Sequence, residues 1–355
     1  MTPVRLPENP RVLVVAMRRL GDVLLTTPLI RSVKRAFPQA TIDALVFSGT
    51  EGVLTGNPDV ADVLTVPQHP RAGETLALAA KIAKRYDLAL STQSGDRPTL
   101  LACVAGRQSA GPVQAEGLGS AVKRFVLSRS YVSDSARHRV LENLRLAELI
   151  GIPASAEVVC PTGAVRTAFA PAQAYAVVHA APMFIYKRWT KDGWRMLAAA
   201  LRERGLATLV TGAAADRAYL DDVWGDSDVA RLDGKLTWPE LSALIGAARA
   251  YIGPDTAITH LAAASGCPTV ALYGPTDPRP WGPWPLGGLD RPWTAAGTIQ
   301  HRGNVWLVQN PLPCLPCQLE GCDRRLDSHS QCLDELSVTQ VLAAVDQALA
   351  MRQAA

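Results

Sequence analysis

The sequence predicts an α/β protein of two doubly wound domains, each a parallel β-sheet covered by helices. Apolar strands alternate with amphipathic helices in both halves of the chain, and the proline-flanked segment Pro161–Pro171, which has weak periodicity, separates them. With 355 residues, 48% of them hydrophobic, the chain can bury two cores. We expect an N-terminal domain over 1–165, a C-terminal domain over 172–335, and a helix within 336–355 that can pack back on the first domain.

The first half begins with a strand followed by a helix. Arg11–Met17 is a continuous apolar run, which is typical of a parallel strand buried on both faces. A turn at Gly21 and Asp22 leads into a helix whose apolar positions run from Val23 to Phe37, and Pro38 ends it. Further along, the pattern predicts strands at Thr41–Phe47 and Asp87–Thr92 and a helix at Thr75–Lys84.

The second half repeats this alternation. It contains predicted strands at Tyr175–Ala180, Thr208–Gly212, Ala250–Gly253 and Thr269–Tyr273, and predicted helices at Lys191–Arg204, Asp216–Trp224, Trp238–Ala247, Ala257–Ser265 and Val338–Met351. Doubly wound sheets bind their ligands at the C-terminal ends of the strands. Two such sheets facing each other would enclose a cleft, so candidate functional residues are those that follow strands.

Charge and composition narrow the possible partners. Residues 1–165 hold 19 Lys+Arg against 14 Asp+Glu, an excess that suits a phosphorylated substrate or an anionic membrane surface, or that forms solvated faces. Neither a basic tail nor aromatic residues among the basic ones are present, which argues against nucleic acid. The start lacks the apolar core of a signal peptide, no apolar run is long enough to span a membrane, and the cysteines suit a reducing compartment, so we expect a cytoplasmic location.

The most informative stretch is Gly253–His260, where a strand ends and a helix begins. Asp255 or Thr256 can cap that helix, and the amides of its first turn would then face an anionic group. Asp255 and His260 add groups that can hold hydroxyls. An anion site beside a carboxylate that binds sugar hydroxyls favours a nucleotide-sugar enzyme.

Two further side chains at strand ends can take part in chemistry. Asp22 is either a helix cap or a general base for a hydroxyl nucleophile. Lys187 is either a surface lysine or a cation that neutralises a departing diphosphate. The loop at Asp22 has one glycine, so the dinucleotide fingerprint is absent, as is any P-loop. Asp226 and Asp228 form an Asp-x-Asp pattern that could hold a metal. However, they lie in a polar turn, where Asp and Ser are ordinary residues, so the match is weak.

Four cysteines cluster near the C-terminus: Cys314, Cys317, Cys322 and Cys332, with His329 nearby. Such a density in a cytoplasmic protein is compatible with a structural metal such as zinc, with disulfides or redox sensitivity, or with reduced thiols in a loop. The spacing fits no standard zinc finger. Structural zinc is therefore kept as one alternative for this cluster, and because the Asp-x-Asp match is weak we expect no catalytic cofactor.

Together these segments resemble glycosyltransferase family 9, the ADP-heptose:lipopolysaccharide heptosyltransferases. The resemblance spans nearly the whole chain, and its motifs are Leu20–Pro28, Lys187–Trp189, Gly253–Ala263 and Leu272–Asp277. The segment Cys314–Cys332 is similar to the cysteine-rich tail loop of heptosyltransferase III-like members. The resemblance implies a GT-B fold of two Rossmann-like domains, with the acceptor bound mainly by the first and an ADP-sugar by the second.

The resemblance also implies roles for single residues in an inverting transfer that needs no metal. Asp22 would deprotonate the acceptor hydroxyl and Lys187 would stabilise the leaving diphosphate, with Arg18 and Arg19 on the acceptor side. Donor binding would involve Tyr186, Gly212, Gly253, Asp255, Thr256, Ala257 and His260.

The expected acceptor is the phosphorylated lipopolysaccharide core and lipid A at the cytoplasmic face of the inner membrane. Ala257 stands where the family often has glycine, and Phe184–Tyr186 replaces small hydroxyl residues before the lysine. These departures bear on donor and acceptor identity. The alternatives are a family-9 transferase with another nucleotide sugar or acceptor, and an inactive nucleotide-sugar-binding protein.

Overall fold

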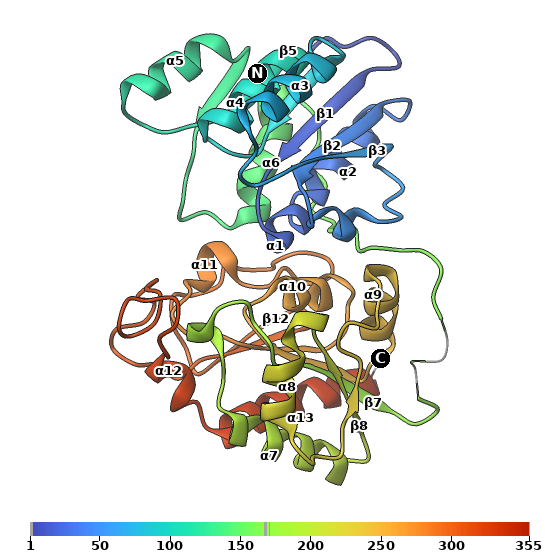
Figure 1. Cartoon of the computed structure of the whole chain (residues 1–355), viewed down its shortest axis with the longest axis vertical. Coiled ribbons are helices and arrows are strands. Elements are labelled where there is room, and N and C mark those ends of the chain that lie inside the picture. The colour runs from blue at the N-terminus through green and yellow to red at the C-terminus, as the bar shows by residue number, and fades with distance from the viewer. Residues whose placement is uncertain (1–2, 167–168, 170, 355) are drawn as a thin grey trace. The chain divides into compact units, whose positions relative to one another are not determined.

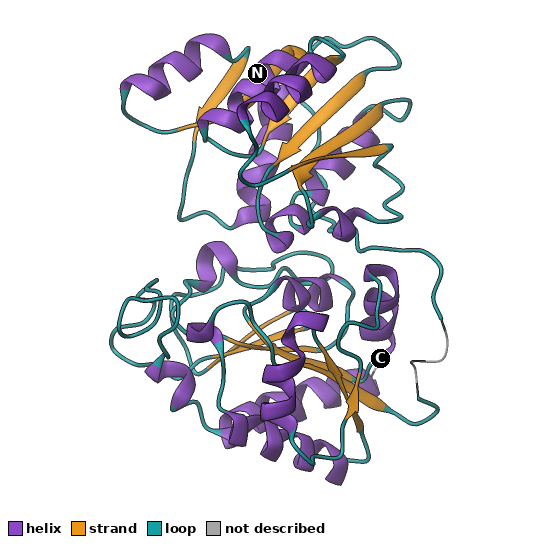
Figure 2. Cartoon of the chain, viewed as in Figure 1, coloured by secondary structure: helices purple, strands orange, loops and turns teal. Residues whose placement is uncertain are grey.

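The chain folds into two compact units, residues 1–161 and 162–355. The computed structural model describes residues 3–166, 169 and 171–354 (Figure 1). The boundary falls at the start of the predicted linker Pro161–Pro171, of which residues 167, 168 and 170 lie outside the described residues. Each unit contains one sheet with helices packed against it (Figure 2).

The first unit is a parallel sheet in the order β3-β2-β1-β4-β5-β6. Its strands are β1 (Arg11–Ala16), β2 (Thr41–Phe47), β3 (Asp62–Val66), β4 (Tyr86–Ser91), β5 (Gly106–Val113) and β6 (Arg129–Val132). Its helices are α1 (Leu20–Leu24), α2 (Thr27–Ala36), the 3₁₀ helix η1 (Glu51–Leu54), α3 (Ala72–Ile82), α4 (Asp96–Ala105), α5 (Leu118–Val126) and α6 (Arg139–Ile150).

The second unit has a sheet in the order β12-β13-β11-β10-β7-β8-β9, parallel except for β12 against β13. Its strands are β7 (Tyr175–His179), β8 (Ala207–Thr211), β9 (Ala230–Arg231), β10 (Ala250–Pro254), β11 (Thr269–Leu272), β12 (Ile299–Arg302) and β13 (Val305–Val308). Its helices are η3 (Ile185–Lys187), α7 (Lys191–Glu203), η4 (Ala214–Asp216), α8 (Arg217–Trp224), α9 (Trp238–Ala247), α10 (Ala257–Ala264), α11 (Pro278–Trp281), α12 (Gln331–Asp334) and α13 (Val338–Ala354).

Both sheets reverse their strand order at one point, as in doubly wound folds. The reversal lies between β1 and β4 in the first unit and between β7 and β10 in the second. Loops leaving adjacent strands on either side of such a reversal diverge to opposite faces of the sheet and leave room for a ligand at its C-terminal edge. The predicted fold class is therefore confirmed, and each unit has one such reversal at which a ligand site is expected.

The helix predicted to run from Val23 to Phe37 is two helices, α1 and α2. The break has a local cause, because Pro28 has no backbone N–H to donate to Leu24. The hydroxyl of Thr27 donates to the carbonyl of Leu24 instead, at 2.8 Å. Asp22 is the third residue of α1 and lies within its first turn, so it is not the N-cap that its position allowed.

The last helix, α13, packs on the second sheet. Val341, Ala344, Val345 and Ala348 of α13 are buried in the same core as Val270 of β11. Arg204, which follows α7, holds Asp346 of α13 in an ion pair at 2.7 Å. The second domain thus extends through α13, because the apolar face of this helix is needed to cover the second sheet.

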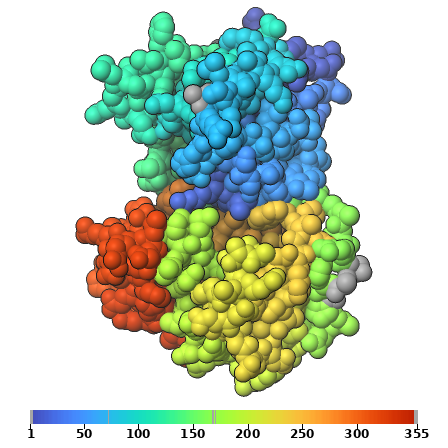
Figure 3. Space-filling model, in the orientation of Figure 1, coloured from blue at the N-terminus to red at the C-terminus, as the bar shows by residue number. Residues whose placement is uncertain are grey.

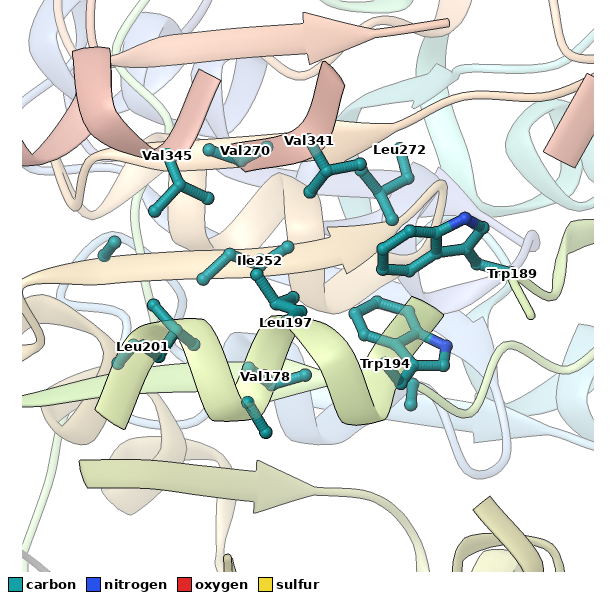
Figure 4. Packing of buried hydrophobic residues seen from close by; sticks show 14 of the residues in the cluster. Val178, Trp189, Trp194, Leu197, Leu201, Ile252, Val270, Leu272, Val341 and Val345 are labelled. Atoms are coloured by element: carbon teal, nitrogen blue, oxygen red, sulfur yellow. The ribbon is translucent and has the colours of Figure 1, made fainter. Parts of the chain in front are cut away.

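Tryptophans form one end of that core (Figure 4). Trp189 and Trp194 meet edge to face with ring centroids 5.0 Å apart, and Trp194 is fully buried. The indole N–H of Trp189 donates to the carbonyl of Leu336 at 2.8 Å. Because Trp189 lies two residues after Lys187, this packing fixes the end of the loop that carries the lysine.

No helix in the described parts of the chain is long and apolar enough to cross a membrane.

Candidate functional site

Three side chains from three neighbouring strand ends meet in the second domain. Lys187 follows β7, Asp255 follows β10 and Thr276 follows β11. The Lys187 ammonium forms an ion pair with Oδ2 of Asp255, and the Thr276 hydroxyl donates to the same oxygen at 2.7 Å. This cluster lies at the reversal between β7 and β10, where a ligand-binding edge is expected.

Asp255 is a buried carboxylate that is held in its charged form. Its side chain is 9% exposed. Burial pushes its pKa upward, but the positive charges of Lys187 and His260 and the hydrogen bonds from Lys187 and Thr276 outweigh burial and hold the pKa below its ordinary value. An ionised carboxylate accepts hydrogen bonds and does not donate them. Asp255 is therefore suited to holding hydroxyl groups.

The beginning of α10 is formed by the next two residues. Thr256 is the N-cap, with extended backbone, and its side chain accepts a hydrogen bond from the amide of Thr259 at 3.4 Å. Ala257 is the first helical residue and, like Thr256, is half-buried. The cap is thus Thr256 and not Asp255, which leaves Asp255 to the cluster above. The first amides of an α-helix have no partner within the helix, so this end of α10 is suited to facing an anion.

The other predicted donor residues lie at the same edge of this sheet. Gly253 is the fourth residue of β10, where an added Cβ would overlap the buried Tyr251 side chain, so glycine is favoured there. Gly212 follows β8, and an added Cβ there would lie 2.7 Å from Leu220. His260 is buried in α10, near enough to lower the pKa of Asp255. Tyr186 is buried in η3, with its ring stacked on Phe184 at 5.2 Å between centroids.

The cysteine-rich segment Cys314–Cys332 is hydrogen-bonded to the two loops that carry Lys187 and Thr276, a contact that the sequence did not predict. The Ser330 hydroxyl donates to the carbonyl of Tyr186 at 2.7 Å, and the amide of Gln318 donates to the carbonyl of Pro275 at 2.8 Å. These two bonds tie Cys314–Cys332 to the residues next to Lys187 and Thr276. Thr276 lies in the Leu272–Asp277 motif, which follows a strand, but the sequence did not identify Asp255 as its partner.

The four clustered cysteines are close enough to influence one another. Cys332 is buried while Cys314 and Cys322 are exposed. Burial, and then the neighbouring Cys317, Cys322 and Cys314, raise the pKa of the Cys332 thiol to about 12. No group of three or more His, Cys, Asp or Glu residues is placed to hold a metal ion within the described ranges. A structural zinc at this cluster stays a prediction.

The candidate residues of the first domain follow β1, beside the reversal between β1 and β4. Asp22 is 13% exposed, and one of its oxygens lies 3.4 Å from the guanidinium of Arg18. Arg19 is the exposed N-cap residue of α1. Burial lowers the pKa of Arg139, the first residue of α6, as does the charge of Arg18, while Asp22 opposes this shift. Arg139 is thus a third cation near Asp22, which its position in the sequence did not reveal.

His179, at the end of β7, gives this edge a pH-dependent stability. Burial lowers its pKa to about 4, although the Asp216 charge partly opposes the shift, and Nδ1 lies 3.2 Å from the carbonyl oxygen of Thr211. The folded state therefore favours the neutral imidazole. Its contribution to stability is fully present above the ordinary pKa of 6.5 and is lost as the pH falls towards 4. We expect His179 to account for about 3 kcal/mol of lost stability between pH 7 and pH 4.

Urea unfolding of wild type and His179→Asn at pH 7 and pH 4.5 measures this effect. Asparagine can keep the hydrogen bond to Thr211 but does not titrate, so the variant should lose clearly less stability than wild type on acidification. An equal loss in the two proteins would contradict a buried neutral imidazole.

Each domain therefore presents a different kind of chemistry. The second domain combines a cation, a charged carboxylate and the amide end of a helix, which suits a sugar joined to a diphosphate. The first domain combines a half-buried carboxylate with cations, which suits a base acting on a hydroxyl of an anionic molecule.

Comparison with known proteins identifies the family. The model of glycosyltransferase family 9 (heptosyltransferase) matches residues 75–287, which is more than half of the chain. The chain belongs to glycosyltransferase family 9. It is thus a glycosyltransferase, and its fold is the GT-B fold of two Rossmann-like domains, as the resemblance implied.

Relatives of this family-9 chain include lipopolysaccharide heptosyltransferases. It is 29% identical to lipopolysaccharide heptosyltransferase 3 of Escherichia coli strain K12 over 289 residues, 76% of this chain and 83% of that protein. It is 27% identical to lipopolysaccharide heptosyltransferase 1 of Pseudomonas aeruginosa over 348 residues, 94% of this chain and 93% of that protein. Among solved structures, E. coli ADP-heptose lps heptosyltransferase II matches with a TM-score of 0.72 and 19% identity, covering 97% of this chain and 99% of that one.

Proposed function

We propose that this family-9 glycosyltransferase moves heptose from ADP-heptose to a sugar of the lipopolysaccharide inner core, with inversion at the anomeric carbon. The observation that carries the proposal is the cluster of Lys187, Asp255 and Thr276 beside the amide end of α10. The names of the relatives support heptose as the transferred sugar, lipopolysaccharide as the acceptor and ADP as the nucleotide.

On the donor side, the diphosphate would lie against the first amides of α10, near Thr256 and Ala257. Lys187 would then share its charge between Asp255 and the diphosphate and would stabilise the negative charge that grows as ADP leaves. Asp255 would hold hydroxyls of the heptose, since it is charged and its Oδ2 already accepts from the Thr276 hydroxyl. We thus assign the neutralisation of the negative charge on the leaving diphosphate to Lys187 and the first amides of α10.

On the acceptor side, Asp22 would accept the proton of the attacking hydroxyl. The hydroxyl oxygen then forms a bond to the anomeric carbon while the bond from that carbon to the diphosphate oxygen breaks, and ADP leaves with its electron pair. Arg18, Arg19 and Arg139 would bind phosphate groups of the acceptor near Asp22. We place this reaction at the cytoplasmic face of the membrane in which the acceptor lipid is anchored.

The nucleotide specificity is tested by thermal unfolding of the purified chain with ADP, UDP, GDP and their sugars. A ligand that binds only the folded state raises the Tm, by an amount that grows with its concentration over its Kd. We expect ADP and ADP-heptose to raise the Tm and UDP and GDP to leave it unchanged. A rise with UDP and none with ADP would assign the chain to another donor. ADP binding without transfer to a purified core would favour an inactive binding protein.

A further inference from the structure

Helix α5 of the first domain turns its apolar side towards solvent. Leu118, Ala121, Val122 and Phe125 are spaced three and four residues apart, so they share one face of the helix. Leu118 is 89% exposed, Val122 60% and Phe125 90%. Figure 1 shows α5 at the periphery of this domain, and the same region projects from the surface in Figure 3.

The opposite face of α5 is polar and holds the helix in this orientation. Ser120 is buried. The side chain of Lys123 is only 15% exposed, and its ammonium donates to the carbonyl of Ser94 at 2.6 Å and pairs with Asp96 at 2.6 Å. Arg124 donates to the carbonyls of Gln114 and Ala115, which fixes the loop before the helix.

This arrangement reverses the ordinary one, in which the apolar stripe of a surface helix faces the core. Single exposed apolar residues are common and carry no meaning. A continuous stripe with a large aromatic side chain is different, because contiguous exposed apolar surface marks a site of interaction.

The charges around α5 indicate which partner covers the stripe. Residues 114–132 contain three basic side chains, Lys123, Arg124 and Arg129, and one acidic one, Glu116, and Asp96 adds a second acidic side chain through its ion pair with Lys123. The whole domain carries 19 Lys+Arg against 14 Asp+Glu. A second copy of the chain would bring these like charges together, whereas anionic lipid headgroups would neutralise them. An apolar face with Leu and Phe beside basic residues is the composition of helices that lie in a membrane interface.

We propose that α5 is a membrane-contact helix that lies in the interface of an anionic bilayer, with Leu118, Val122 and Phe125 among the acyl chains. The inference rests on the proposed function, because an enzyme that acts on a lipid-anchored acceptor has to work at the bilayer surface. It deepens that function by assigning the membrane contact to one helix of the acceptor domain.

Vesicle co-sedimentation tests the proposal. Wild type is compared with the double variant Leu118→Gln/Phe125→Gln on vesicles of phosphatidylethanolamine and phosphatidylglycerol, and on vesicles of phosphatidylcholine alone. The matched control is Leu76→Gln/Met196→Gln, which removes two apolar side chains that are 75% and 58% exposed elsewhere. We expect wild type and control to bind the anionic vesicles, and the α5 variant to bind them at least about tenfold more weakly.

Two further measurements separate this proposal from its alternatives. With a lipid-free core oligosaccharide as acceptor, the α5 variant should transfer as fast as wild type, whereas with acceptor embedded in vesicles it should be slower. Absence of transfer by wild type on the lipid-free acceptor would count against the proposed function alone. Equal vesicle binding by wild type and the α5 variant would overturn the membrane assignment. So would a variant that binds vesicles like wild type but differs from it in oligomeric mass by light scattering.

Discussion

Asp22→Asn is expected to fold like wild type and to lose about a thousandfold in kcat, because positioned general bases contribute roughly 10² to 10⁴ in rate. Asparagine keeps the shape of the side chain but cannot accept the proton of the acceptor hydroxyl. Asp22 is half-buried and its ion pair with Arg18 is long at 3.4 Å, so we expect little loss of stability. Transfer is measured by product formation under saturating donor and acceptor, and folding by the Tm.

Asp228→Asn is the matched control for this variant. Asp228 also pairs with an arginine, Arg202, at 3.7 Å, but its side chain is 81% exposed and lies in the turn after α8. We expect wild-type kcat for this control. A loss of transfer there would revive the Asp-x-Asp pattern as a functional element, while wild-type turnover by Asp22→Asn would show that another group is the base.

Lys187→Met is expected to reduce both turnover and stability. It removes the cation assigned to the leaving diphosphate, which we expect to lower kcat by about a hundredfold or more, as for other preorganised electrostatic groups. It also leaves the carboxylate of Asp255 buried without its ion-pair partner, which we expect to cost about 3 kcal/mol in the free energy of unfolding. Turnover and urea unfolding of the same preparation measure the two effects.

The double variant Lys187→Met/Asp255→Asn separates these effects. Because it removes the uncompensated charge, it should recover most of the lost stability while remaining inactive. The control Lys191→Met removes a lysine four residues away that pairs with Asp222 at the surface, and it should change neither quantity. If Lys187→Met were as stable and as active as wild type, neither the ion pair nor the leaving-group role would stand.

The sequence predicted the ends of strands better than the partners of the side chains found there. Gly253–Thr256 is recognisable because an apolar strand stops at glycine and proline and a capping residue follows. Lys187 and Asp255 are 68 residues apart, and only the pairing of β7 with β10 brings them together. Thr276 joins them through the pairing of β10 with β11, which no spacing in the sequence encodes.

Elements with weak patterns were missed for related reasons. Strand β5 contains Gly106, Gly111 and Pro112, residues that disfavour strands in isolation, and it is held in place by pairing with β4 and β6. Helix α5 buries a polar face, so its hydrophobic pattern gives no indication of how it packs. In both cases tertiary contacts override the local preference of the sequence.

The most direct test of the central claim is the mass of a lipopolysaccharide core acceptor after incubation with the purified chain and ADP-heptose. The proposed function predicts an increase by one heptose residue, release of one ADP per transfer, and no increase when Asp22→Asn replaces wild type. An unchanged acceptor with ADP-heptose, together with a mass increase from a UDP- or GDP-sugar, would contradict it.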